Sequence, residues 1–279
     1  MVATVCKNLR SPLHRPGRDF ALPFRRRRRH CAGMKAIAAA SLALALVLSP
    51  AAHAAAPAGF TPLFNGRDFT GWTVPEGDNG HWKVLDGVID YDAESEAKGD
   101  KNLWTVKEYG DFTLRMDWRI KRTTGLYPMP DVLPDGSHRL GPDGKEIITP
   151  RPNADSGIYL RGAGKSQINI WCWPVGSGEV YGYRMDKTMP PAVRAGVTPK
   201  VNADKPVGEW NTFEITMKGD RLTVVLNGKT VIENAQLPGV PAKGRLALQH
   251  HGGRNPKTGE LNAASSLMQF RNLYVKELK

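Results

Sequence analysis

The feature that most constrains the fold is a strict alternation of apolar and polar side chains along residues 112–121. The apolar positions are Phe112, Leu114, Met116, Trp118 and Ile120. Because side chains of an extended strand point alternately to its two faces, this period of two predicts a strand with one buried face. The same alternation returns in residues 212–218, and residues 222–226 follow after the Gly219–Asp220 turn.

Turn residues separate further candidate strands. Asn227 and Gly228 lie between two β-rich runs and predict a two-residue hairpin, since both turn positions of such a hairpin need positive φ. More strands are expected at residues 157–160, 167–172, 245–249 and 267–278. No helical period lasts ten residues, so the sequence predicts an all-β fold, an antiparallel sandwich or jelly roll. Chain ends often pair in such folds, and residues 60–64 are expected beside the last strand.

Two segments do not read as strands. Residues 123–154 contain six prolines and four glycines, and residues 185–209 contain Pro190–Pro191 with two later prolines. Long irregular segments are usually functional or mobile. Both segments flank residues 155–183, so they are either walls of a site or surface loops.

The amino-terminal residues have the pattern of an export signal. Met34 and Lys35 precede the apolar run Ala36–Leu48, and Ala52 and Ala54 form a small-x-small site. This order is typical of a secretory signal peptide, and 13 apolar residues are too few for a stable membrane span. We expect residues 34–54 to be removed, leaving residues 55–279 as a single periplasmic or secreted β-sandwich domain. Because no cysteine directly follows the apolar run, no lipoprotein membrane anchor is expected.

Residues 1–33 precede this signal and contain five consecutive arginines, Arg25–Arg29. They are either an upstream extension from a mis-assigned start or a disordered leader; the alternative is a patch for nucleic acid or membrane. The formal net charge of +12 belongs mostly to residues 1–54, because residues 55–279 hold 29 basic and 26 acidic side chains. A nearly neutral domain gives no electrostatic case for a nucleic-acid partner.

Cysteine usage excludes an internal disulfide in the expected domain. Cys6 and Cys31 lie in the leader, so Cys172 is alone in residues 55–279. A functional interpretation makes Cys172 a nucleophile, whereas its position between Trp171 and Trp173 favours a packed thiol.

One predicted strand has a polar and aromatic face. Ile168 and Ile170 share its apolar face, and the opposite face holds Gln167, Asn169, Trp171 and Trp173. Amides bond sugar hydroxyls and indoles stack on the apolar face of a sugar ring. This face therefore indicates a sugar site, with a solvent-facing strand covered by a loop as the alternative.

Other polar side chains cluster nearby in sequence. Glu179 and Tyr181 follow the polar strand, while Asp155 and Arg161 bracket residues 156–160, as one ion pair or two ligand contacts. The segment Gln249–His251 ends another strand, and adjacent histidines point to opposite faces, so at most one enters a given pocket. No phosphate loop, G-x-S-x-G elbow or H-E-x-x-H motif is present.

Short motifs in order along residues 60–278 resemble the 3-keto-disaccharide hydrolase family, also described as 3-keto-α-glucoside lyase and 3-keto-2-hydroxyglucal hydratase domains. They are Phe64–Gly66, Phe69–Trp72, Tyr109–Phe112, Asp155–Gly162, Gly208–Asn211, Gln249–Gly252 and Phe270–Leu273. The resemblance implies a concanavalin-like jelly roll of two antiparallel sheets. Two departures stand out: many members have an acid in the strand of Gln167–Asn169, and His250 replaces an acid while His251 matches the usual histidine.

The resemblance implies a chemistry in which a 3-keto group acidifies the C2 proton of a glycoside. Proton removal and β-elimination at C1, followed by hydration, give net hydrolysis. It implies His251 as acid/base, Arg161 or a bound divalent cation at the enolate oxygen, and Asp155 and Glu179 as further acid/base or metal-ligand candidates. A small-molecule sugar would contact Gln167, Asn169, Trp171, Trp173, Tyr181, Gln249 and His250.

The alternative is a non-catalytic, lectin-like carbohydrate-binding module, because one sandwich fold serves both functions. The two differ in geometry. An enzyme should gather His251, Arg161 and a carboxylate in one pocket, whereas a binding module should present only aromatic and amide side chains on an open face.

Overall fold

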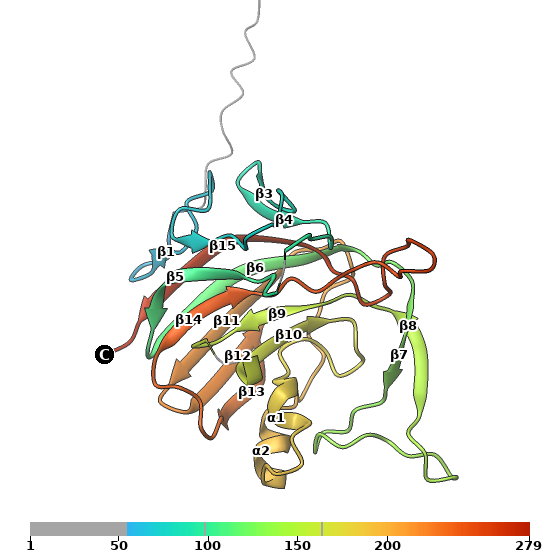
Figure 1. Cartoon of the computed structure of the whole chain (residues 1–279). Coiled ribbons are helices and arrows are strands. Elements are labelled where there is room, and N and C mark those ends of the chain that lie inside the picture. Colours follow the sequence, from blue (N-terminus) through green and yellow to red (C-terminus); the bar gives the residue numbers. More distant parts are fainter. Residues whose placement is uncertain (1–54, 98, 163) are drawn as a thin grey trace, which may run out of the picture. The chain divides into compact units, whose positions relative to one another are not determined.

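Strands of two antiparallel sheets face each other across an apolar core in the computed structural model, which describes residues 55–97, 99–162 and 164–279 (Figure 1). The larger sheet contains β1 (Thr61–Pro62), β3 (Trp82–Leu85), β4 (Val88–Tyr91), β6 (Phe112–Arg122), β11 (Asn211–Lys218), β12 (Arg221–Leu226), β13 (Lys229–Gln236) and β15 (Leu267–Glu277). The smaller sheet contains β2 (Trp72–Thr73), β5 (Leu103–Tyr109), β9 (Asp155–Tyr159), β10 (Gln167–Trp171) and β14 (Gly244–Leu248). The predicted all-β, concanavalin-like jelly-roll sandwich is confirmed.

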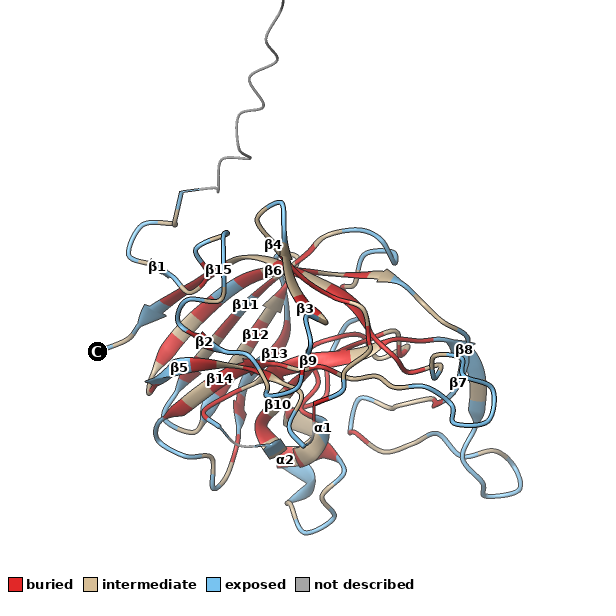
Figure 2. Ribbon diagram, turned by 45° about the horizontal axis from the view of Figure 1, so that its top comes forward, coloured by how far each residue is buried: buried red, intermediate tan, exposed pale blue. Residues whose placement is uncertain are grey.

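The alternation along residues 112–121 has the predicted effect. All five apolar side chains of β6 are at most 5% exposed, and they lie in the main core between the sheets. Burial of such side chains contributes on the order of 2 kcal/mol each, which holds the two sheets together. Figure 2 shows the buried residues concentrated along the strands of the two sheets and the exposed ones mainly in the loops.

Two turn and pairing predictions are also confirmed. Asn227 and Gly228 join β12 to β13 with φ of 51° and 78°, the positive values that a two-residue hairpin needs. The chain ends pair as expected: β1 lies antiparallel to β15, with Thr61 opposite Val275.

The expectation that residues 123–154 contain no strand is wrong. β7 (Leu126–Pro130) and β8 (Ile148–Pro152) form a separate two-stranded sheet, here called the arm, which lies apart from the sandwich in Figure 1. Pro128 faces Pro150 across the pair, so this must be a non-hydrogen-bonded position of the ladder. The other strand prolines, Pro130 and Pro152, lie two residues from this pair and so also occupy non-hydrogen-bonded positions. The missing N–H of each proline therefore removes no hydrogen bond between the strands.

Helical structure is confined to short segments in the described residues. They are a 3₁₀ turn at Gly164–Ser166, α1 (Tyr181–Arg184) and α2 (Pro191–Gly196). Pro191 begins α2, a position where its missing N–H has no helical partner to lose. In this described part of the chain, no helix combines the length and apolar character that a membrane crossing requires. The predicted signal peptide and upstream leader, residues 1–54, lie outside the described residues.

Candidate functional site

A cavity of about 420 Å³ lies where β9, β10 and the residues after β14 meet the arm. Its sheet wall contains eight of the residues singled out from sequence: Asp155, Gln167, Asn169, Trp171, Trp173, Tyr181, Gln249 and His251. Its other wall comes from the arm and the loop between its strands, so the hypothesis that residues 123–154 form a wall of the site holds geometrically.

Strand register explains why the sheet wall gathers these residues. Tyr159 pairs with Gln167 on one side and Ala247 on the other, and Trp171 pairs with Asp155. Gln249 N–H continues the β14 ladder by donating to the Gly157 carbonyl. Continuing that register brings His251 beside Asp155. The alternate residues, including Ile158, Ile168 and Leu248, point into the core and are at most 2% exposed.

His251 and Asp155 form the titratable pair of the cavity. His251 Nδ1 lies 3.2 Å from the Ala264 carbonyl oxygen, which can only accept, so Nδ1 carries a proton in this contact. His251 Nε2 lies 4.0 Å from Asp155 Oδ2, beyond hydrogen-bond distance. In the neutral ring, Nε2 therefore has a lone pair that Asp155 does not engage, and the 43% exposure of the side chain leaves it accessible to a ligand.

The carboxyl group of Asp155 has a pKa closer to neutral than that of an ordinary aspartate. Burial raises its pKa to about 6, because removing water penalises the carboxylate more than the nearby imidazole charge stabilises it. Ala264 O accepts from the Asp155 backbone N–H as well as from His251, so one carbonyl positions both groups. A carboxyl group that titrates near neutral pH beside an imidazole is suited to general acid–base chemistry.

Amide side chains form a connected row next to this pair. Gln167 Nε2 donates to Gln249 Oε1, and Gln249 Nε2 donates to the Tyr159 hydroxyl at 3.1 Å. A Cβ at Gly157 would lie 2.4 Å from Gln167 Nε2, so the row depends on a glycine beneath it. The hydrogen bonds hold the amides in place before any ligand arrives.

Trp171 and Trp173 line the cavity, but they also pack together. Their rings are stacked with centroids 4.1 Å apart, and the side chains join Met129 of β7 in a small apolar cluster. Tyr181 meets both indoles edge-on. Because each indole uses one face on the other, the pair is a rigid boundary of the cavity and offers less stacking surface than two separate platforms.

Arg161 is not part of the cavity, and its predicted role at an enolate oxygen is wrong. Its side chain is fully buried and pairs with Asp111 at 2.9 Å. Its other N–H groups donate to the carbonyls of Gly110, Gly219 and Pro241. Arg161 therefore ties together turns of the sandwich, and the proposed ion pair with Asp155 does not form.

Glu179 is also misplaced by the sequence interpretation. It is fully buried against Arg184 in an ion pair and does not line the cavity. Burial lowers the pKa of Arg184 to about 10. Glu179 therefore supports a buried charge and does not contact a ligand in the cavity.

His250 points to the opposite face from His251, as strand alternation predicts, so its expected substrate contact is wrong. Its ring stacks on Tyr91 with centroids 4.5 Å apart, and Nε2 donates to the Glu94 carbonyl. Burial lowers the pKa of His250, which favours the neutral ring.

The sequence interpretation missed His138 and Glu146, which come from the loop between β7 and β8. Both line the cavity, with His138 Nδ1 3.0 Å from Glu146 Oε1 and Nε2 2.9 Å from Arg184 Nη1. One signal in the sequence could have found this wall of the cavity. The prolines in Pro128–Pro130 and Pro150–Pro152 are spaced two residues apart, as in a pair of edge strands, and such a pair would hold the loop between them.

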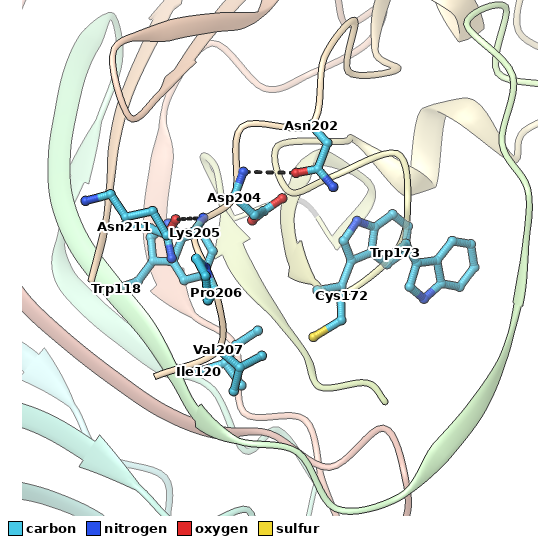
Figure 3. Close-up of a pocket in the computed structure, with 11 residues that line it drawn as sticks. Trp118, Ile120, Cys172, Trp173, Asn202, Asp204, Lys205, Pro206, Val207 and Asn211 are labelled. Atoms are coloured by element: carbon cyan, nitrogen blue, oxygen red, sulfur yellow. Dashed lines mark hydrogen bonds between the residues drawn. The ribbon is translucent and has the colours of Figure 1, made fainter. Parts of the chain in front are cut away.

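A second cavity, of about 210 Å³, adjoins the other side of the tryptophan pair (Figure 3). It is lined by Trp118 and Ile120 of β6, by Cys172, and by part of residues 202–211. The predicted loop at residues 185–209 thus contributes to this cavity and not to the larger one. Burial raises the pKa of the Cys172 thiol, which favours the packed-thiol interpretation over a nucleophile.

A divalent cation was one candidate for the enolate oxygen. Within the described residues, no three His, Cys, Asp or Glu side chains are grouped so that they could hold a metal ion. On the sheet wall, His251 and Asp155 supply two such side chains, and their polar neighbours Gln167, Asn169 and Gln249 are neutral amides. The described residues of the cavity therefore do not supply three such side chains grouped around one point for a divalent cation.

Comparisons with known proteins agree with the architecture. Residues 59–276 match the model of a family described as 3-keto-alpha-glucoside-1,2-lyase-like domain. A 2.13 Å crystal structure from Parabacteroides distasonis, provisionally described as a glycosyl hydrolase, shares 20% identity over 80% of this chain and 85% of its own, with a TM-score of 0.50.

Two further solved structures are similar at lower scores. Another crystal structure of a provisional glycosyl hydrolase from Parabacteroides distasonis shares 20% identity over 79% of this chain and 94% of its own, with a TM-score of 0.48. The β-glucanase of Bacillus licheniformis shares 14% identity over 79% of this chain and 97% of its own, with a TM-score of 0.38. No match was found among curated protein sequences.

Proposed function

The chain belongs to the 3-keto-alpha-glucoside-1,2-lyase-like family, and from this premise we propose that it cleaves 3-keto-glycosides by C2 proton abstraction, β-elimination and hydration. The coarser statement, a carbohydrate-active and glycosyl-hydrolase-like protein, follows from the family. The observation that carries the finer proposal is the accessible His251 Nε2 beside Asp155 in one cavity.

The proposed reaction begins at the C2–H bond, which the neighbouring keto group acidifies. His251 Nε2 takes the C2 proton, and the electron pair moves into the C2–C3 bond to form an enolate at the C3 oxygen. The electrons return as the C1–O bond breaks, and the departing oxygen takes a proton from the Asp155 carboxyl or from the His251 imidazolium. Water then adds across the resulting C1=C2 bond, hydroxyl to C1 and proton to C2, so that atoms balance as net hydrolysis.

Because Arg161 lies outside the cavity, another group must stabilise the enolate oxygen in this scheme. The donors left on the sheet wall for the enolate oxygen are the side-chain amides of Gln167, Asn169 and Gln249. Neutral amide donors that are already held by their neighbours stabilise developing negative charge without reorganising during the reaction.

The direct test is incubation of the purified protein with 3-keto-trehalose and 3-keto-sucrose, with and without EDTA. We expect release of the free sugar product from both, and no cleavage of unmodified trehalose, whose C2 proton is not acidified. If neither keto-sugar gives product, with or without EDTA, the proposed reaction is wrong. Loss of product only with EDTA would assign a metal requirement.

A non-catalytic carbohydrate-binding role is the second candidate. The observation that favours it is that only Asp155 and His251 of the four catalytic candidates reach the cavity, together with amides and a tryptophan pair. Under this alternative, the wild-type protein would bind a sugar in the cavity and would not turn over a 3-keto-glycoside.

We further propose export to the periplasm or the medium, on the basis of the signal pattern at residues 34–54. Intact-mass measurement of the exported protein should give a chain that begins near Ala55. An exported chain that retains residues 1–33 would contradict this.

A further inference from the structure

Two carboxyl groups line the large cavity, and lysine and arginine are missing from its described lining. Asp155 contributes a carboxyl group from the sheet wall and Glu146 contributes another from the arm, with 51% of the Glu146 side chain exposed. Among the described residues, no lysine or arginine lines this cavity. Arg184 is nearby through His138, but its charge is compensated by Glu179 in the buried ion pair.

Hydrogen-bond directions fix how Glu146 is presented. Arg184 has only N–H donors, so His138 Nε2 must accept from it at 2.9 Å. The ring proton of His138 is then on Nδ1, which lies 3.0 Å from Glu146 Oε1. His138 is thus held neutral in this arrangement. The neutral ring contacts the Glu146 carboxylate and supplies no positive charge to the cavity.

The buried pair behind the wall anchors this arrangement. Arg184 Nε engages Glu179, while Nη1 also donates to the Gly136 carbonyl at 3.2 Å. Arg184 therefore bonds two residues of the loop between β7 and β8, Gly136 and His138, and holds that loop in a fixed position at the cavity. Because both charges are fully buried, displacing either would leave the other unpaired at a large energetic cost.

We propose that Glu146 makes the cavity selective for neutral saccharides and against anionic ones such as uronosides, with His138 as its positioning residue. The inference rests on the proposed function only in taking the cavity as a saccharide site. Neutral hydroxyls can donate to the carboxylates and accept from the amides. A uronate carboxylate would meet Glu146 and the ionised fraction of Asp155 without a lysine or arginine to compensate its charge, and like charges at close range oppose binding.

Tryptophan fluorescence can measure the selectivity, because Trp171 and Trp173 line the cavity. Methyl α-glucopyranoside and methyl α-glucopyranosiduronate are titrated at pH 7.5 into the protein and its variants. The wild type should bind the neutral sugar at least about tenfold more tightly. Glu146→Gln should reduce that ratio to about threefold or less by improving uronoside affinity, whereas Glu146→Asp, which keeps the charge, should retain most of it.

Glu233→Gln on β13 is the matched control, since it removes an exposed carboxylate outside the cavity and should leave the ratio unchanged. Thermal melts of all variants check folding. An equal or stronger uronoside affinity in the wild type, an unchanged ratio in Glu146→Gln, or binding of neither sugar would overturn the inference. Neutral-sugar selectivity without turnover of a 3-keto-glycoside would instead reject the proposed reaction and leave the selectivity standing.

Discussion

The two walls of the cavity are built differently. The sheet wall belongs to a five-stranded sheet whose inward residues, such as Ile168 and Ile170, are fully buried. The arm is a two-stranded sheet that leaves Leu126 and Ile148 62% and 45% exposed, and the loop between its strands is bonded to Arg184 of the buried Arg184–Glu179 pair. The difference indicates that the sheet wall holds His251 and Asp155 rigidly, whereas the arm wall is the part whose position can be altered by single substitutions.

Removing Arg184 should give the largest change in stability. Arg184→Ala leaves Glu179 buried and unpaired and releases the arm loop, so we expect a loss of about 3–5 kcal/mol in the free energy of unfolding. Lys107→Ala is the control, because the Lys107–Glu277 pair is more than half exposed and should contribute about 1 kcal/mol or less. Denaturant titration measures both, and equal small losses would show that the arm does not depend on the buried pair.

A methyl group beneath the amide row should perturb the sheet wall to a smaller extent. At Gly157 a Cβ would lie 2.4 Å from Gln167 Nε2 and 2.6 Å from the Ile168 carbonyl, so Gly157→Ala should cost roughly 1–3 kcal/mol and weaken sugar binding. Gly110→Ala is the matched control, since its Cβ would meet only the Ala242 carbonyl at an ordinary 3.6 Å. Equal melting temperatures and equal sugar affinities of the two variants would contradict the close packing of the amide side chains over Gly157.

The smallest expected effect is a pH dependence from Asp155. Its pKa is raised from 3.8 to about 6, so between these values the folded state retains a proton that the unfolded state releases. The protonated carboxyl thus favours folding at low pH, and this contribution is lost as pH rises from about 4 through about 6. Asp155→Asn should therefore gain stability relative to wild type with rising pH, by less than the limit of about 3 kcal/mol that the shift sets, because solvent screens the 30% exposed side chain. A relative stability that does not change between pH 4 and 7.5 would contradict the raised pKa.

Strands with regular alternation could be predicted from sequence because burial of one face imposes the period directly. β6 and β11 are examples, and the Asn227–Gly228 hairpin has a local conformational cause. The arm was missed because prolines suppress the expectation of a strand. These prolines fit the sheet because they occupy positions where the strands share no hydrogen bond. That arrangement depends on pairing with a strand about 20 residues away along the chain.

The same distinction applies to the site. Asp155, Gln167 and His251 were found because alternation along a strand decides which face a side chain occupies. Arg161 and Glu179 were misplaced because each forms a buried ion pair. The partner of each is set by tertiary contacts, which the alternation of side chains along a strand does not predict. Asp111 is 50 residues from Arg161 in sequence. The arm residues Glu146 and His138 required the same long-range information.

The central claim is that His251 Nε2 removes the C2 proton, and the most direct test is steady-state turnover of 3-keto-trehalose by His251→Asn beside His250→Asn. His251→Asn keeps polarity but cannot exchange a proton near neutral pH, so kcat should fall by roughly 10²–10⁴-fold with little change in melting temperature. His250→Asn should lower the melting temperature, because its ring packs on Tyr91, and should retain kcat per folded molecule. Wild-type turnover in His251→Asn, or an equal loss of kcat in both variants, would contradict the account.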